Sequence, residues 1–181
     1  MNGCAGFMIK TIRSSIKVIL LNDKDELLLM CADDPKTTSA DGKYFGKFWF
    51  AVGGEIEQNE SIQETAYREV YEETSIKKDE IELGPIVWFG EFDLILNGTL
   101  TRLKQRFIVA KTKQINVDLK NLTLLEKKVV KDLAWFSIDE IKNSKEIIYP
   151  ALLSTYLPDI ISGNYPKDPI EIDLSKLPKN I

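Results

Sequence analysis

The stretch from Gly53 to Ile76 limits the possible folds of this chain more than any other segment. It opens with two adjacent glycines, which allow the backbone to turn sharply and to approach a neighbouring group closely. Ser61 and Glu64, three residues apart, form a capping-box pattern that predicts a helix starting near Ser61. One face of this helix combines apolar residues with two glutamates: Ile62, Ala66, Glu69, Val70, Glu73 and Ile76.

Two carboxylates one helical turn apart are unusual on a face that points inward. Like charges at this spacing repel, and carboxylates taken out of water cost several kcal/mol unless positive charge meets them. A hard divalent cation such as Mg²⁺ would remove both penalties, because it prefers oxygen ligands. Taken alone, the helix is equally compatible with a solvated acidic face. Glu57 and Glu60, in the short loop after the glycines, add two carboxylates and favour the metal site.

The spacing of these residues resembles the Nudix box, G-x5-E-x7-R-E-U-x-E-E-x-G-U, in which U is an aliphatic residue. The chain departs from the pattern at Ser75, where the family has glycine, and just before it at Val52, where proline is common. Neither residue carries chemistry, so both bear on local stability, and Ser75 is expected in a left-handed conformation at the helix end. Eight of the nine specified positions match: Gly54, Glu60, Arg68, Glu69, Val70, Glu72, Glu73 and Ile76.

The resemblance implies a metal site on the predicted helix. By this resemblance Glu69 and Glu73 bind metal directly, Glu72 binds directly or through water, and the carbonyl of Gly53 completes the site. The implied cofactor is Mg²⁺ or Mn²⁺. Such a cation would neutralise the phosphate oxygens of a diphosphate linkage, lower the pKa of bound water and hold the reacting groups in line.

We count Arg68 among the candidate catalytic residues, and its expected role is to hold the loop in position. Its guanidinium is always charged and only donates hydrogen bonds, so a loop carboxylate, Glu57 or Glu60, is the expected partner. The alternative is an exposed pair with Glu64 on the helix surface, which would contribute only tenths of a kcal/mol.

The general base is not fixed by the box. The family often takes it from a strand that crosses the site, or from the loop before the last strand. The strand candidate, LKQRF, offers only Lys104 and Gln105, which do not suit the role near neutral pH. The loop offers Glu126 within LTLLEKKVV, and we rank it slightly ahead of the alternative, Glu72.

Nudix enzymes typically cleave a nucleoside diphosphate linked to another moiety, and the resemblance implies this reaction here. Trp49 is the first candidate platform for a base, with Trp88, Phe89 and Phe92 as alternatives. Lys47 and Arg102 are the first candidates for phosphate contacts, with Lys43 and Arg106 as alternatives. Buried core packing explains these aromatic residues equally well, and an ordinary charged surface explains the cations.

Composition excludes several classes of function. A chain of 181 residues with 44% hydrophobic and 29% charged residues is typical of a globular protein, and its net charge of −4 argues against a nucleic-acid or membrane-surface partner. The absence of histidine excludes Ser-His and Cys-His nucleophiles and His-based zinc sites. Two cysteines, Cys4 and Cys31, are too few for a disulfide framework. With no membrane-length apolar run and no signal peptide, we expect a cytoplasmic protein, a monomer or a homodimer. The resemblance implies that it acts on a small nucleotide-type molecule.

The order of the predicted elements leaves the fold class open between α/β and α+β, and the resemblance implies an αβα sandwich with a mixed sheet between helices. We expect one domain over residues 1–181, with a loose leader at 1–11 and a C-terminal extension at 149–181. The expected order is a hairpin (14–21 and 27–31), a surface loop (32–46), a strand (47–52), the box helix, a turn (82–85), a hairpin around Asn97-Gly98, a long connection (113–131), a strand (133–136), a helix capped by Ser137 and a last helix within 149–163.

Two other functions fit parts of the sequence. One is a catalytically silent Nudix-fold module that senses a nucleotide, although the complete acidic set argues against it. The other is an interaction domain with an acidic helix, for which the eight matches would be chance.

Overall fold

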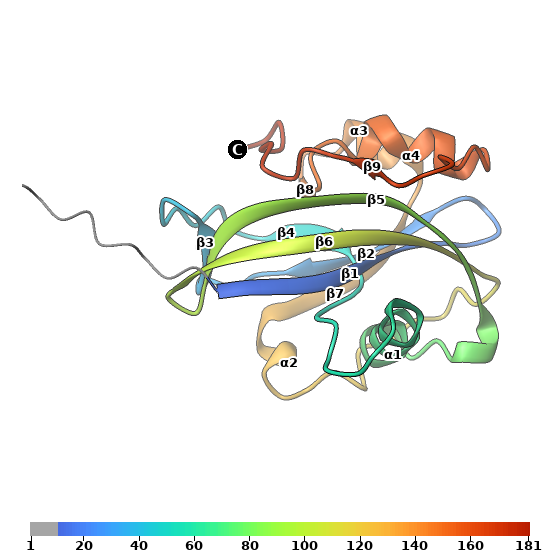
Figure 1. Cartoon of the computed structure of the whole chain (residues 1–181), viewed down its shortest axis with the longest axis horizontal. Coiled ribbons are helices and arrows are strands. Elements are labelled where there is room, and N and C mark those ends of the chain that lie inside the picture. Colours follow the sequence, from blue (N-terminus) through green and yellow to red (C-terminus); the bar gives the residue numbers. More distant parts are fainter. Residues whose placement is uncertain (1–10) are drawn as a thin grey trace, which may run out of the picture.

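The computed structural model describes residues 11–181, and in it a mixed β-sheet separates helices on its two faces (Figure 1). Helix α1 lies below the sheet in this view, and α3 and α4 lie above it. The αβα sandwich is therefore confirmed. The helices are α1 (Ile62–Thr74), α2 (Glu126–Val129), α3 (Ile138–Asn143) and α4 (Leu153–Ile161), with a short 3-10 helix, η1 (Lys78–Glu80). The strands are β1 (Thr11–Leu21), β2 (Leu27–Ala32), β3 (Thr37–Ser39), β4 (Phe48–Ala51), β5 (Ile81–Leu96), β6 (Thr99–Thr112), β7 (Val130–Phe136), β8 (Ile147–Tyr149) and β9 (Ile170–Glu171).

Strand β1 lies at the centre of the sheet, whose order is β3-β5-β6-β1-β2-β4-β8, with β7 also paired to β2 and β9 to β5. It runs parallel to β6 along its whole length, whereas its antiparallel pairing with β2 is limited to Leu21 and Leu27. The predicted hairpin is thus present only at its turn. Beyond the turn, the segment 52–56 takes the second edge of β1: Ile16 N donates to the carbonyl of Gly54 (3.0 Å) and Val18 N to that of Val52 (2.9 Å).

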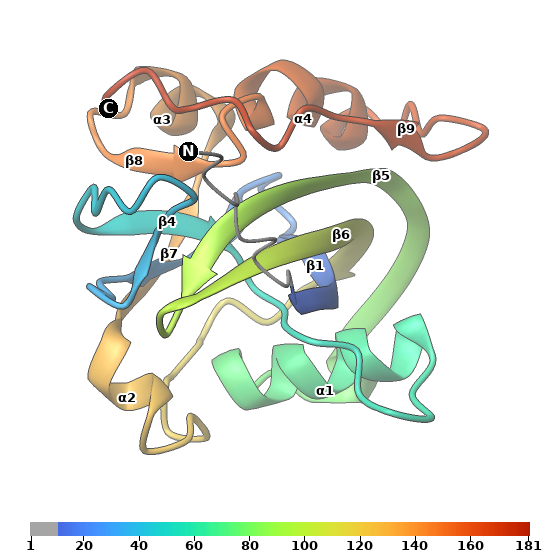
Figure 2. The same cartoon turned by 60° about the vertical axis from the view of Figure 1, so that its left-hand side comes forward.

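Two apolar cores fill the sandwich. The first, between the sheet and α1, contains Ile16, Val18 and Val70. The second, between the sheet and the C-terminal helices, contains Trp88 and Phe107. Figure 2 shows the C-terminal chain passing over this second face next to β5. Within the described residues no helix is long and apolar enough to cross a membrane.

Local sequence signals are confirmed where the structure describes them. Ser61 and Ser137 each cap a helix through a complete capping box. Asn97 and Gly98 both have positive φ values (48° and 81°) and join β5 to β6 in the expected hairpin. The C-terminal helix is present as α4. Residues 1–10 of the expected leader lie outside the described residues, and Thr11 already belongs to β1.

Several short elements differ from the prediction. The turn expected at 82–85 is wrong, because these residues belong to β5, where the pairing with β6 shifts between Leu83 and Ile86. Pro85 lacks a backbone N–H, so the ladder is interrupted while the strand continues. The loop at 32–46 contains β3, the long connection contains α2, and β8 was not predicted. Elements of three or four residues are too short to show a periodic pattern.

Candidate active site

The paired glycines place the loop backbone in contact with both the sheet and the helix. Gly53 has a φ of 132°, and a Cβ added to it would lie 2.2 Å from the carbonyl oxygen of Ile16. A Cβ on Gly54 would lie 2.4 Å from Oε1 of Glu69. Any side chain at either position would displace backbone or a buried carboxylate, so this loop geometry requires glycine.

Helix α1 carries two carboxylates on its buried face. Glu69 is 7% exposed and Glu73 is 5% exposed, among the apolar residues that pack against the sheet. The backbone N–H of Gly53 donates a 2.6 Å hydrogen bond to Glu73. The predicted inward face is therefore confirmed, and the glycine loop lies directly against its acidic part.

Burial perturbs both carboxyl groups. It raises the pKa of Glu73 to about 8, an effect that the positive charge of Lys17 opposes and the negative charge of Glu69 reinforces. Burial also raises the pKa of Glu69, although hydrogen bonding to Arg68 opposes the shift. The positive charges of Arg68 and Lys17 therefore do not compensate fully for the burial of these two carboxylates.

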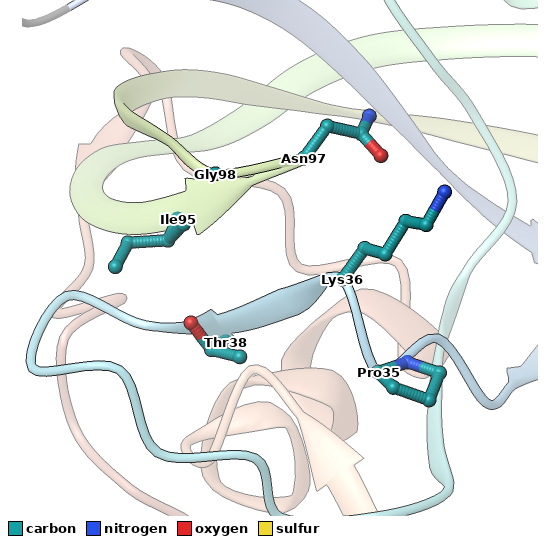
Figure 3. A pocket seen from close by; sticks show the side chains of 6 residues that line it. All are labelled: Pro35, Lys36, Thr38, Ile95, Asn97 and Gly98. Carbon is teal, nitrogen blue, oxygen red and sulfur yellow. The ribbon is translucent and has the colours of Figure 1, made fainter.

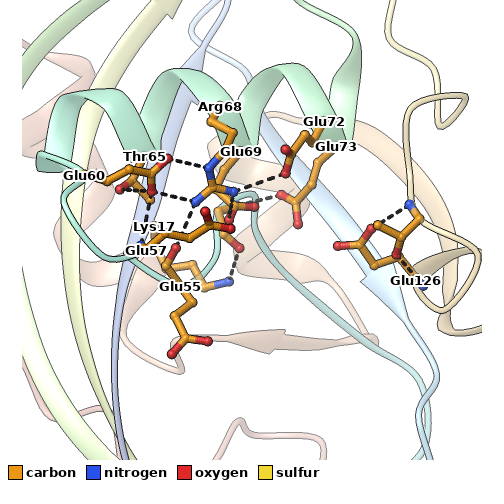
Figure 4. A network of polar contacts seen from close by, with 12 residues as sticks. Lys17, Glu55, Glu57, Glu60, Thr65, Arg68, Glu69, Glu72, Glu73 and Glu126 are labelled. Carbon is orange, nitrogen blue, oxygen red and sulfur yellow. Dashed lines mark hydrogen bonds and ion pairs between the residues drawn. The ribbon is translucent and has the colours of Figure 1, made fainter.

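Arg68 ties the helix to the loop (Figure 4). Its guanidinium binds both carboxylate oxygens of Glu60, at 2.6 and 2.8 Å, and donates to the carbonyl of Glu55 at 3.0 Å. It also contacts Glu69 at 2.7 Å and Glu72 at 3.2 Å. The hydrogen bonds from Arg68 are the main reason that the pKa of Glu60 falls to about 2. Of the two loop carboxylates proposed as its partners, Arg68 contacts Glu60.

Glu57 has another position. Its side chain is exposed, and its backbone N–H donates to the carboxylate of Glu60 at 3.1 Å. This bond closes the loop between the glycines and the helix. The structure therefore gives Glu57 a local backbone contact with Glu60 and no contact with Arg68.

Lys17 is a site residue that no sequence motif predicted. Its half-buried side chain extends from β1, and its Nζ donates a 3.0 Å hydrogen bond to the carbonyl of Gly53. The ammonium also lies 4.6 Å from the centre of the Phe50 ring, and burial lowers its pKa. A sequence signal existed, because this lysine interrupts the apolar run from Ile16 to Leu21.

The donor set suits a hard cation. It combines the Gly53 carbonyl with three glutamates, Glu69, Glu72 and Glu73, which supply oxygen ligands only. In the described part of the chain, no three acidic side chains converge on one point, because Arg68 holds two of these glutamates and Gly53 N holds the third. The ammonium of Lys17 provides a positive charge at the same carbonyl. The oxygen-only chemistry of these residues therefore fits a divalent cation.

Glu126 lies apart from the helix glutamates. It is the first residue of α2, and its carboxylate accepts a 2.8 Å hydrogen bond from the backbone N–H of Thr123. Figure 4 places it beyond Glu72 and Glu73, separated from both. Its negative charge nevertheless contributes to the raised pKa of Glu73.

The three candidate substrate residues do not gather at this site. Trp49 is 8% exposed, and its ring packs edge-on against Phe136 in the core below the C-terminal helices, so it does not offer a free face to a base. Arg102 is paired with Asp93 on the neighbouring strand at 2.8 Å. Lys47 is exposed and precedes β4 at the end opposite Gly53.

Two of the cavities on the described surface can be compared with the site. The larger, of about 420 Å³, lies between the β5–β6 hairpin and the chain around β3 (Figure 3), and it includes no residue of the box. The smaller, of about 180 Å³, adjoins the glycine loop through Ile56. Phe89, Lys104 and Arg106 also line the smaller cavity, so an exposed aromatic ring and two cations lie next to the loop. Phe89 and Arg106 were among the alternatives for substrate contacts, whereas Lys104 was not.

Comparisons with known proteins agree with this geometry. The NUDIX domain family model matches residues 11–154. Among solved structures, a MutT protein from Methanosarcina mazei Go1 is 23% identical, with a TM-score of 0.57 and coverage of 87% of this chain and 98% of the other. A NUDIX hydrolase from Nitrosomonas europaea is also 23% identical, with a TM-score of 0.54 and coverage of 87% and 95%.

A more distant match is an Ap4A hydrolase from C. elegans, solved as a binary complex. It is 16% identical, with a TM-score of 0.55 and coverage of 84% of this chain and 97% of the other. At these identities the three structures establish a common fold. The family model covers most of the chain and includes the whole loop and helix described above. The chain therefore belongs to the NUDIX family.

Proposed function

We propose that this chain is a Mg²⁺- or Mn²⁺-dependent hydrolase that cleaves the diphosphate linkage of a nucleoside diphosphate joined to another moiety. The observation that carries the proposal is the contact between the buried carboxylates of α1 and the backbone of the paired glycines. Glu69 and Glu73 are buried with raised pKa values and lie against a loop that only glycine can form.

In this proposal Glu69, Glu73 and the carbonyl of Gly53 hold the cation, and Glu72, which is half-buried, binds it directly or through water. When bound, the cation would neutralise phosphate oxygens and lower the pKa of water. Arg68 keeps the acidic residues in position, because its two bonds to Glu60 fix the guanidinium on the loop. A carboxylate accepts the proton of the attacking water, and Glu126 is ranked slightly ahead of Glu72 for this role.

The smaller cavity is the best candidate for the nucleoside. Phe89 is 39% exposed there and can stack on a base, while Lys104 and Arg106 can meet phosphate oxygens. The cavity adjoins the box loop, so a nucleoside bound in it could direct its diphosphate toward α1. The name of the C. elegans relative, an Ap4A hydrolase, is consistent with such a substrate class.

The proposal is tested by measuring product release from a panel of nucleoside triphosphates, sugar nucleotides, dinucleoside polyphosphates and ADP-ribose. We expect Mg²⁺-dependent cleavage of at least one compound and loss of that activity in Glu73→Gln. A protein that binds a nucleotide tightly but releases no product with any of the four classes would instead be the silent sensing module. Undiminished turnover in excess chelator would exclude the metal site.

A further inference from the structure

Lys17 is a charged residue of this site to which the proposed function assigns no role. Among residues 11–181, the carbonyl of Gly53 is the only hydrogen-bond acceptor that its ammonium contacts, at 3.0 Å. The backbone N–H of the same glycine donates to Glu73, and a Cβ on Gly54 would lie 2.4 Å from Glu69, so both proposed ligand carboxylates lie beside this loop. A lysine on the central strand thus places a monovalent cation on the proposed ligand oxygen, next to two of the proposed ligand carboxylates.

The carbonyl cannot move away from Lys17. A Cβ on Gly53 would lie 2.2 Å from the Ile16 oxygen and 3.1 Å from the Cα of Lys17, so the two backbones are already in contact. Hydrogen bonds from Ile16 N to Gly54 and from Val18 N to Val52 fix the loop on either side. The lysine side chain, by contrast, has four flexible carbons and only this one hydrogen bond to lose.

A divalent cation on the Gly53 oxygen would be repelled by this ammonium. Mg²⁺ binds oxygen at about 2.1 Å, so the ammonium in its present position would lie no more than about 5 Å from the metal. The repulsion between the two charges at that separation is strong in a half-buried site. Arg68 does not compete with a metal for the Gly53 oxygen, because its guanidinium is held on the carboxylate of Glu60 by two hydrogen bonds.

We propose that Lys17 stands in for the metal in the metal-free protein and leaves the Gly53 carbonyl when Mg²⁺ or Mn²⁺ binds. The ammonium keeps the loop and the buried carboxylates together before the metal arrives. Metal binding is then an exchange of one cation for another, and Lys17 lowers the intrinsic affinity of the site. This inference rests on the metal site of the proposed function.

The test is a Mn²⁺ titration without substrate, followed by calorimetry, on the wild type and on Lys17→Met. Removing the competing charge should tighten Mn²⁺ binding by about tenfold or more. Lys111→Met removes the same charge from an exposed position on the adjacent strand β6, and this control should change the affinity by no more than about twofold. The rise in melting temperature caused by Mn²⁺ should also be larger in Lys17→Met than in the wild type.

Lys17→Gln provides a second variant in case the methionine protein does not fold without metal. The amide can still donate to Gly53 but carries no charge, so it should also bind Mn²⁺ more tightly than the wild type. If the wild-type protein binds no Mn²⁺, the metal site is wrong, and both the proposed function and the role of Lys17 fail with it. A wild type that binds Mn²⁺, with neither Lys17 variant binding more tightly, would overturn only the role of Lys17.

Discussion

At the scale of single residues, burial and hydrogen bonding act on Glu73 in opposite directions. Its carboxyl group is almost inaccessible to water, which favours the neutral form, yet it accepts a short hydrogen bond from Gly53 N, which favours the anion. The outcome is a pKa of about 8 in place of 4.5. The metal-free protein consequently binds a proton that the unfolded chain would release at neutral pH.

This difference predicts how the stability of the metal-free protein depends on pH. Between about pH 4.5 and 8 the folded state binds more protons at Glu73 than the unfolded state does, so stability is lost as the pH rises through this window. We expect the melting temperature in chelator to fall from about pH 5 to about pH 8. Glu69, whose pKa burial also raises, would act in the same direction, and the chain has no histidine to titrate in this window. In Glu73→Gln the fall in melting temperature over this pH range should be much smaller. A fall equal to that of the wild type would show that another group causes it.

Metal should have the opposite effect on this residue, because it binds the ionised carboxylate. Saturating Mg²⁺ or Mn²⁺ is expected to stabilise the folded state by mass action and so to raise the melting temperature. At a metal concentration of one hundred times the dissociation constant, the free energy of unfolding should rise by about 2.7 kcal/mol. Glu73→Gln should abolish most of this increase, since the amide carries no charge. Differential scanning fluorimetry with increasing metal measures both proteins. A full metal response in the variant would show that Glu73 is not a ligand.

The choice of base can be decided at two residues. Glu126→Gln should lower turnover by roughly 10²–10⁴ and leave the metal-induced rise in melting temperature intact, as expected for the loss of a positioned base. Glu72→Gln should reduce metal stabilisation if Glu72 is a ligand. Steady-state kinetics on the best substrate of the panel, combined with thermal melts, separates the two effects. If turnover in Glu126→Gln falls by less than about tenfold, the general base is a residue of the box, with Glu72 as the candidate.

At the scale of elements, the end of α1 shows how one residue connects a helix to a distant loop. Ser75 has the expected left-handed conformation, with a φ of 67°. Its hydroxyl donates to Asp118 at 2.6 Å and accepts from Asn121 at 3.1 Å, so the serine holds the connection that leads to α2 and Glu126. Glycine, the usual residue of the motif, would relax the backbone but could not make these bonds.

Two substitutions separate these contributions. Ser75→Ala keeps the left-handed strain and loses the hydrogen bonds, so it should destabilise the protein by about 0.5–1.5 kcal/mol. Ser75→Gly loses the same bonds but gains about 1 kcal/mol from the relaxed backbone, so it should be close to neutral. Urea denaturation gives both values. If Ser75→Gly proves as unstable as Ser75→Ala, the left-handed conformation imposes no cost.

Element by element, the sequence predicted what depends on neighbours in the chain. The capping boxes at Ser61 and Ser137 and the Asn97-Gly98 turn are local patterns, and each appeared as expected. The partner of β1 was not predictable, since its pairing with β6 joins residues far apart in sequence. The site shows the same division. The box residues were found by spacing, whereas Lys17 belongs to the site only because the fold brings β1 beside Gly53.

At the scale of the whole molecule, the C-terminal segment completes the second core. Ile172 and Leu174 are buried against the sheet beside Trp88 and Phe107, and β9 pairs with β5. This close packing is possible because residue 90 has no side chain. A Cβ there would lie 2.5 Å from the carbonyl oxygen of Ile172 and 2.8 Å from Cγ of Leu174.

Gly90→Ala should therefore lower stability by about 1–3 kcal/mol by forcing the C-terminal segment away from the sheet. Gly84→Ala is a matched control on the same strand, where the nearest atom would be 3.3 Å away, and it should cost less. Chemical denaturation and limited proteolysis of the C-terminal segment measure the effect. Equal stability of the two variants would show that the segment accommodates a methyl group.

The parallel pairing of β1 with β6 also has a consequence for synthesis on the ribosome. Thr11 pairs with Thr101 and Leu21 with Lys111, so the β6 edge of the central strand has no partner until ninety further residues are made. At about 5–20 residues per second, that interval lasts roughly 5–20 s. During it the apolar run from Ile16 to Leu21 is available to chaperones. Nascent chains arrested before residue 99 should remain protease-sensitive in β1, whereas chains that expose residue 112 should protect it.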